Sequence, residues 1–207
     1  MKNVTITYHG HACFTLEADG FRTVLDPYED GMIPGLPSLR LNAEAVLCSH
    51  GHGDHNAVSA VTVCPTEKTP PYRLESLETA HDDQGGALRG KNLVRIFDFD
   101  GFRVAHLGDL GTVPQGEILE KLQGLDCMLI PVGGTFTIDP AAAWETIEKT
   151  GPRVIIPMHY RTDTMGFDVL CHLEEFTKHF APVNVCDNTA ILNQNTPKQV
   201  LVVNYKP

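Results

Sequence analysis

The sequence predicts an α/β fold in which two β-sheets pack together with helices on the outside, giving four layers. Two observations predict this arrangement. The first half of the chain contains hairpin-like pairs of strands, with Asp-Gly turns at residues 19–20 and 100–101. The second half alternates apolar strand-like runs with helical segments. At 207 residues the chain is long enough for one substantial core, so we expect residues 1–207 to form one domain.

The N-terminal half reads as strands joined by turns and one long loop. Residues 4–26 (VTITYHGHACFTLEADGFRTVLD) predict two strands around Asp19-Gly20. Residues 27–42 contain three prolines and two glycines, which predicts a loop long enough to border a functional site. Residues 43–48 (AEAVLC) predict a short buried strand that leads directly into SHGHGDHN. A second hairpin is expected over residues 92–109.

The C-terminal half predicts alternating helices and strands. The best-marked helix begins after Asp139, which is a cap residue followed by Pro140, and ends before Gly151. Leu170, Leu173 and Phe176 have the spacing of one apolar helix face. The predicted helices cover residues 114–124, 140–150 and 168–180, and the predicted strands cover residues 127–132, 153–160 and 199–205.

Composition narrows the classes of function. The formal net charge is −10 and no basic run occurs, which argues against a nucleic-acid partner. No segment reaches the roughly 18 consecutive apolar residues of a membrane helix. The N-terminus MKNVTITYHG lacks the apolar block of a signal peptide, so we expect a cytoplasmic protein. The short, acidic chain is expected to act on a small molecule.

The cysteines are scattered and form no C-x-x-C pair. A chain of this size does not need disulfides, so we expect free, buried thiols. Cys48 lies two residues before His50 and is either a soft metal ligand or, as we favour, a buried strand residue. The six are Cys13, Cys48, Cys64, Cys127, Cys171 and Cys186.

A cluster of histidines in CSHGHGDHNA is the strongest functional signal. The pattern His50-x-His52-x-Asp54-His55 would occur by chance in roughly one chain in a thousand of this histidine content. Imidazole nitrogens and carboxylate oxygens suit a divalent ion such as zinc. Two histidines two residues apart on an extended segment point the same way, and Asp54-His55 can face a second ion. Gly51 and Gly53 leave the backbone free to turn.

With these residues the sequence resembles the metallo-β-lactamase superfamily, in which H-x-H-x-D-H follows a buried strand. A histidine, an aspartate and a histidine follow in that family, and this chain offers His81 in TAHDDQGG, Asp109 in VAHLGDLG and His159 in IIPMHY. The stretches GHACF (10–14) and LDP (25–27) are similar to those of small lactamase-like hydrolases. The resemblance implies a four-layer αββα sandwich in a single domain.

The resemblance also implies a ligand set for two ions. His50, His52 and His81 would hold one ion, Asp54, His55 and His159 would hold the other, and Asp109 would bridge them. His106 is an alternative to His81. Two further roles stay open: Asp26 either orients a ligand histidine or ends a strand in a turn, and His11 lies near the site or serves packing.

The expected function is that of a metal-dependent hydrolase. Two divalent ions about 3.5–4 Å apart can share an acidified hydroxide, so no nucleophilic side chain is needed. We expect Zn²⁺ before Mn²⁺ or Fe²⁺, with Asp54, Asp109 and His159 as catalytic residues, and a small ester, lactone or phosphodiester as substrate. His52 stands where the redox members of the family carry glutamate. The alternative is a metal-binding or sensing protein without catalytic turnover.

Overall fold

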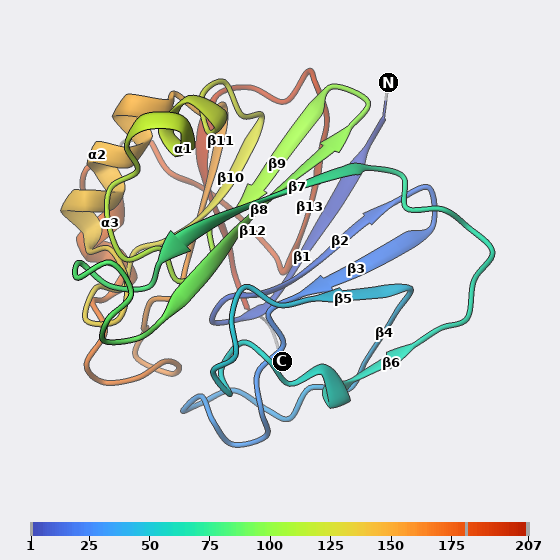
Figure 1. Cartoon of the computed structure of the whole chain (residues 1–207), viewed down its shortest axis with the longest axis horizontal. Helices are drawn as coiled ribbons and strands as arrows, with labels where there is room; N and C mark the ends of the chain where they lie inside the picture. The colour runs from blue at the N-terminus through green and yellow to red at the C-terminus, as the bar shows by residue number, and fades with distance from the viewer. Residues whose placement is uncertain (1, 181, 206–207) are drawn as a thin grey trace.

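Two β-sheets packed face to face form the centre of the computed structural model, which describes residues 2–180 and 182–205 (Figure 1). The first sheet has five strands in the order β13-β1-β2-β3-β5, and the second has seven in the order β12-β14-β11-β10-β9-β8-β7. A small two-stranded sheet, β4-β6, lies beside the first. One apolar core runs between the sheets and includes side chains from Val4 to Val203.

The five-stranded sheet follows from alternating side chains and Asp-Gly chemistry. Alternate residues of β1 are buried, as expected for a strand with one face in the core. Asp19 and Gly20 both have positive φ, at 52° and 67°, which matches the twist that a two-residue hairpin turn requires. The strands are β1 (Val4–Gly10), β2 (Cys13–Ala18), β3 (Phe21–Leu25), β5 (Ala45–Leu47) and β13 (Thr189–Leu192).

The seven-stranded sheet is antiparallel at one end and parallel at the other. Its strands are β7 (Arg73–Ala80), β8 (Lys91–Phe99), β9 (Phe102–His106), β10 (Cys127–Pro131), β11 (Val154–Met158), β14 (Gln199–Val203) and β12 (Asn184–Cys186). The hairpin β8-β9 turns at Asp100-Gly101 as predicted. Every residue of β10 and β11 is buried, as is typical of central parallel strands covered on both faces.

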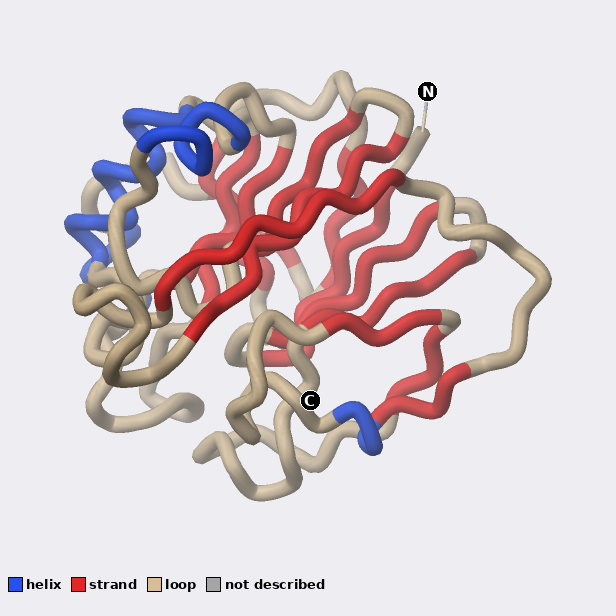
Figure 2. The backbone as a smooth tube through the Cα atoms, viewed as in Figure 1, coloured by secondary structure: helices blue, strands red, loops and turns tan. Residues whose placement is uncertain are grey.

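Three α-helices lie together beside the seven-stranded sheet (Figures 1 and 2). They are α1 (Gly116–Lys121), α2 (Pro140–Thr150) and α3 (Leu173–Thr177). Helix α2 has the predicted ends, because the Asp139 carboxylate accepts a hydrogen bond from the Ala142 amide at 2.8 Å and Gly151 is left-handed. On the other side, beside β5, lie a single 3-10 turn, η1 (Val58–Ala60), and the strands β4 (Leu41–Ala43) and β6 (Val61–Val63).

The structure corrects three predicted elements. The first of the two strands expected around Asp19-Gly20 is divided into β1 and β2 by a turn at His11-Ala12. The helix expected over residues 168–180 is only α3, because the backbone before it bonds elsewhere: Arg161 binds the carbonyl groups of Leu170 and Cys171, and the Cys171 amide donates to Gly133. The strand expected over residues 43–48 shortens to β5, which is half-buried because it forms an edge of its sheet. Strand β4 begins at the end of the expected loop, and β6, β7, β12 and β13 were not predicted.

The cysteines are free, as the sequence predicts, but only Cys13 and Cys127 are buried. The other four are partly exposed, which corrects the expectation that all are buried; Cys48 lies just past the edge strand β5. No helix within residues 2–180 and 182–205 is long and apolar enough to cross a membrane.

An ion pair between Arg22 and Glu44 ties β3 to the corner between β4 and β5. The Glu44 carboxylate accepts hydrogen bonds from the Arg22 amide at 2.7 Å, from Nη2 at 2.8 Å and from Nε at 3.2 Å. These bonds lower the pKa of Glu44 to about 2. Because the pKa is lower in the folded chain than in the unfolded chain, the pair stabilises the fold above about pH 4.3 and loses this effect as the pH falls towards 2.

We therefore predict that Glu44→Gln lowers the free energy of unfolding by about 1 kcal/mol at pH 7. The difference from the wild type should shrink when both are measured by urea unfolding at pH 3.5. Glu67→Gln, which removes the same charge at an exposed position, serves as the control and should change little at either pH. An equal loss for Glu44→Gln at both pH values would contradict the assignment.

Candidate metal centre

The residues of the candidate site all follow the ends of strands, at one edge where the two sheets meet. His11 follows β1, Asp26 follows β3, and the segment 49–55 follows β5 in the five-stranded sheet. His81 follows β7, Asp109 comes three residues after β9, and His159 follows β11 in the seven-stranded sheet. Each strand is anchored in the core, so the side chains beyond it start from fixed positions. The site therefore joins the two sheets.

The Asp26 carboxylate orients the histidine cluster. Oδ1 accepts a hydrogen bond from the Ser49 amide at 2.6 Å, and Oδ2 accepts from the Ser49 hydroxyl at 2.6 Å and from Nδ1 of His55 at 2.8 Å. Because Nδ1 of His55 is engaged, Nε2 is the nitrogen left to bind a metal. Ser49 Oγ also lies 2.9 Å from Nδ1 of His50, which leaves Nε2 of that ring free as well. Asp26 therefore orients the histidine cluster through hydrogen bonds, and it also ends strand β3.

Asp109 lies at the centre of the site. Its Oδ2 is 3.3 Å from Nε2 of both His81 and His159, and Oδ1 is 3.2 Å from Nε2 of His55. The Asp109 amide donates to Asn92 Oδ1 at 2.9 Å, which fixes the backbone. Gly108 before it has φ of 54°, and a Cβ there would lie 2.2 Å from Asn92 Oδ1, so no other residue fits without a shift.

The donor atoms fall into overlapping groups in which every donor lies within 4.8 Å of the others. One group is His50, His52 and His81. A second is His11, Asp54, His55 and His159, and the third brings Asp109 together with His50 and His55. The seven predicted ligands are therefore all brought together.

His106, the alternative to His81, is bonded elsewhere. Its Nε2 lies 2.9 Å from the Ala12 carbonyl, and its Nδ1 accepts from the Gly108 amide at 3.1 Å. Cys48 is in none of the donor groups found among the described residues.

His11 joins the site although its role was left open by the sequence. Its Nε2 lies 3.3 Å from Asp54 Oδ2, and its ring centre lies 4.0 Å from that of His159. The backbone of His11 and His159 is left-handed at both residues, with φ of 54°, and so is that of Asp26, with φ of 46°. The His159 amide donates to the His11 carbonyl at 2.9 Å, so these two turns hold each other.

Several buried donor atoms have no hydrogen-bond partner within the described residues. Buried nitrogen and oxygen atoms rarely stay unsatisfied, because leaving water without a replacement bond is unfavourable. Most of the unpartnered atoms belong to residues of the donor groups, and Nε2 of His50, His55 and His159 lies 3.2–3.9 Å from the Asp109 carboxylate, as ligands of a shared cation do, so the residues fit a metal. The unsatisfied atoms are His11 Nδ1, His50 Nε2, His55 Nε2, His81 Nδ1, Asp109 Oδ1, both ring nitrogens of His159 and, outside the donor groups, Arg95 Nε.

The protonation of the site also suits a cation. Burial and the neighbouring histidines lower the pKa of His50 to about 4 and that of His11 to about 3, so both rings are neutral at pH 7. Burial alone raises the pKa of Asp109, but the charges of His159 and His55 lower it well below its usual range. Burial alone lowers the pKa of His55, but the carboxylates of Asp109 and Asp26 raise it. A bound cation would displace that proton.

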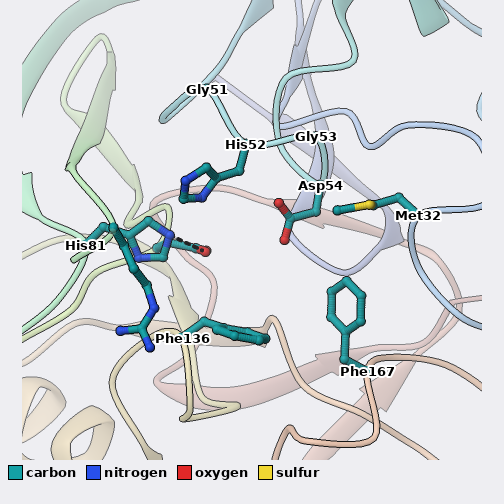
Figure 3. Close-up of a pocket in the computed structure, with 10 residues that line it drawn as sticks. Met32, Gly51, His52, Gly53, Asp54, His81, Phe136 and Phe167 are labelled. Atoms are coloured by element: carbon teal, nitrogen blue, oxygen red, sulfur yellow. Dashed lines mark ion pairs between the residues drawn. The ribbon is translucent and has the colours of Figure 1, made fainter.

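A cavity of about 610 Å³ opens onto this cluster (Figure 3). Figure 3 shows Phe136 and Phe167 on the side of the cavity opposite His52. Met32 lies in the proline-rich segment 27–42, which therefore borders the site as predicted. The lining residues are Met32, Gly51, His52, Gly53, Asp54, His81, Arg89, Asp109, Phe136 and Phe167.

Sequence reasoning missed two residues of the loop that follows His81. The buried Asp82 carboxylate accepts hydrogen bonds from four backbone amides, at 2.8–2.9 Å, and so closes the loop from residue 81 to residue 90. Burial alone raises the pKa of Asp82, but these four donors lower it to about 2. Arg89, near the end of the loop, lines the cavity. The only sequence signal is Asp82 with Gly85-Gly86 three residues further on.

Comparisons with known proteins agree with this arrangement. A family model for the beta-lactamase superfamily domain matches residues 5–159. A UPF0173 metal-dependent hydrolase from Thermoplasma acidophilum is 28% identical over 78% of this chain and 85% of its own length. A similarly named protein from Archaeoglobus fulgidus is 29% identical over 76% of this chain and 83% of its own length.

Solved structures extend the likeness to nearly the whole chain. One from Thermotoga maritima, described as a candidate zinc-dependent hydrolase of the metallo-β-lactamase superfamily, is 34% identical, with a TM-score of 0.76, and covers 97% of this chain and 98% of its own. A metallo hydrolase from Ignicoccus hospitalis, 20% identical with a TM-score of 0.68, shares the fold over 92% of this chain and 99% of its own. The family model matches, the metal-ligand candidates follow strand ends, and the fold is the four-layer αββα sandwich. This chain therefore belongs to the metallo-β-lactamase superfamily.

Proposed function

We propose that the protein is a metal-dependent hydrolase that binds two divalent ions, Zn²⁺ before Mn²⁺ or Fe²⁺, and cleaves a small ester, lactone or phosphodiester. The observation that carries this proposal is the set of buried, unpartnered donor atoms around Asp109, contributed by both sheets. The names of the relatives, which are metal-dependent hydrolases, support it.

The ligand roles are part of the proposal. His50, His52 and His81 would hold one ion, and Asp54, His55 and His159 the other, with Asp109 between them. The grouping of the donor atoms and the central place of the Asp109 carboxylate support this division. His11, beside Asp54, is an additional donor to the second group. When bound, a pair of divalent ions supplies an acidified water and polarises the substrate oxygen.

The described side chains that line the cavity include no nucleophile, so we assign this role to water. No serine, threonine or cysteine is among the described residues that line it. Asp54 and Asp109 line the cavity, whereas His159 is fully buried, does not line the cavity and has Nε2 3.3 Å from Asp109 Oδ2. We therefore assign the proton-accepting role to Asp54, whose side chain is 13% exposed and lies beside His11 Nε2, and the positioning of the Asp109 carboxylate to His159. His106 is hydrogen-bonded to the backbone at both nitrogens and does not reach the substrate.

The proposed substrate is small because of the dimensions of the cavity. A volume of about 610 Å³ lies within the range of pockets that bind metabolites, which is roughly 300–1,000 Å³. The fold by itself does not select the bond that is cleaved, since one fold supports many reactions.

We also propose that residues 1–207 act as one domain in the cytoplasm. The core supports the first part of this proposal, because β14 near the C-terminus pairs with β11 and shares a core with β1. The location stays a prediction from the N-terminal sequence.

The first prediction from this proposal concerns metal content and the choice between His81 and His106. Protein purified without chelator should contain about two divalent ions per chain by elemental analysis. Removing a residue that only hydrogen-bonds to a metal ligand typically weakens metal binding 10- to 100-fold. Removing a ligand itself should cost at least as much, so His81→Ala should lower the affinity for one ion by about 100-fold or more in a chelator competition. His106→Ala should keep metal affinity but lower the free energy of unfolding of the metal-free protein by about 1–3 kcal/mol, because the Ala12 carbonyl loses its partner.

Two results would contradict these assignments. A stoichiometry that stays below one ion per chain after metal is added would rule out the two-ion site. Loss of metal in the His106 variant alone would exchange the roles of His81 and His106.

The second prediction concerns activity. We expect the metal-loaded protein to hydrolyse at least one of bis-p-nitrophenyl phosphate, p-nitrophenyl esters, lactones or a chromogenic lactam, assayed with zinc and with manganese. Asp109→Ala should reduce that rate to the background, because the central carboxylate contacts histidines of both groups. Asp163→Ala, an exposed control purified in the same way, should retain the rate.

The pattern of results separates the branches. Fastest turnover of the phosphodiester would select phosphodiester cleavage, and fastest turnover of esters or lactones would select acyl chemistry. Equal activity in Asp109→Ala would indicate a contaminant. No turnover with both ions bound would leave a metal-binding protein without catalysis.

A further inference from the structure

Arg89 is the only lysine or arginine among the described residues that line the cavity. Its guanidinium lies over the Phe136 ring, 5.7 Å from the ring centre. No ion pair or side-chain hydrogen bond engages this guanidinium within residues 2–180 and 182–205. A guanidinium held over a ring by a cation–π contact still has N–H groups free to bind a carboxylate or phosphate through two bonds.

The position of Arg89 is built into the loop. The Arg89 amide donates to Asp82 Oδ2 at 2.8 Å, and the Leu88 amide donates to the same oxygen at 2.9 Å. Asp82 is 2% exposed, so water does not compete for these bonds. The loop closes where the His81 amide donates to the Gly90 carbonyl at 3.0 Å. The same loop therefore places a proposed metal ligand at its start and a free cation near its end.

The rest of the cavity wall away from the donor cluster is apolar. Phe136, Phe167 and Met32 line it, and the Phe136 and Phe167 ring centres are 6.2 Å apart (Figure 3). The chain as a whole carries a formal charge of −10, which repels anions at a distance. A cation placed without a carboxylate partner in such a cavity gives an anionic ligand one local binding point beyond the metal centre.

We propose that Arg89 is a specificity-determining residue that binds a carboxylate or phosphate group of the substrate. This group is separate from the bond that is cleaved. Phe136 and Phe167 contact an apolar or aromatic part of the substrate that lies between the two. The statement that one bond of this ligand is cleaved rests on the proposed function. The contact between Arg89 and the anionic group does not depend on it.

Matched acid and amide ligands test this proposal. The wild type should hydrolyse 4-acetoxyphenylacetate with a kcat/KM about tenfold or more above that of 4-acetoxyphenylacetamide, in which a neutral amide of the same size replaces the carboxylate. Arg89→Met should bring the ratio close to one, and Arg89→Lys should keep an intermediate ratio, since the charge stays but the planar fork is lost. Arg73→Met, at an exposed arginine on β7 outside the cavity, should retain the wild-type ratio.

A binding measurement separates failure of this proposal from failure of the proposed function. Phenylacetate, benzylphosphonate and phenylacetamide are titrated calorimetrically into metal-loaded and metal-free wild type and Arg89→Met. We expect at least one of the two anions to bind the wild type about tenfold or more tightly than the amide, and Arg89→Met to lose this difference with or without metal. The anion with the larger loss identifies carboxylate or phosphate as the natural group.

The opposite results are equally clear. An anion preference that survives in Arg89→Met, or that is present only with metal bound, would overturn the proposal and assign the preference to the metal centre. Absence of any anion preference in the wild type would overturn it too. If no ester is hydrolysed but the Arg89-dependent binding is present, the proposed function fails while the inference about Arg89 stands.

Discussion

The Asp26 carboxylate accepts hydrogen bonds from the Ser49 amide, the Ser49 hydroxyl and Nδ1 of His55, all within 2.6–2.8 Å and shielded from water. These bonds join the end of β3 to the loop after β5, and they leave Nε2 of His50 and His55 free. In a buried environment such bonds are strong and an unsatisfied carboxylate is unfavourable. The direction of the histidine cluster therefore depends on a residue that makes no contact with the cavity.

The donor set couples the two sheets electrostatically. Asp109 comes from the seven-stranded sheet, and Asp54 and His55 come from the five-stranded sheet, so a cation between them would attract ligands from both sides of the core. An ion that binds only the folded chain adds its binding free energy to the free energy of unfolding. We therefore expect metal to hold the edge of the sandwich together, while the loop from residue 81 to residue 90 keeps its form through the Asp82 carboxylate and the backbone bond between His81 and Gly90.

Sequence reasoning reached the parts of the fold and site that are encoded locally. The Asp-Gly hairpins, the caps of α2 and the contiguous segment 50–55 each carry their signal within a few residues. His81, Asp109 and His159 were found because each follows a strand in a context that resembles a known family, and their ligand roles remain predictions. His11 was left open because its partner Asp54 lies 43 positions away. Asp82, Arg89 and the short α3 depend on bonds formed only in the folded chain.

The left-handed backbone at His11, Asp26 and His159 is an unfavourable conformation, so it lowers the stability of the fold. A residue other than glycine in this conformation is disfavoured by about 1–3 kcal/mol, although histidine and aspartate tolerate it better than branched residues. Glycine at His11 or His159 would relax the backbone and remove a side chain of the site, whereas glycine at Asp26 would also remove three buried hydrogen bonds. A library screened only for thermal resistance of the metal-free protein would thus enrich changes that dismantle the centre, so folding and chemistry make conflicting demands at the same positions.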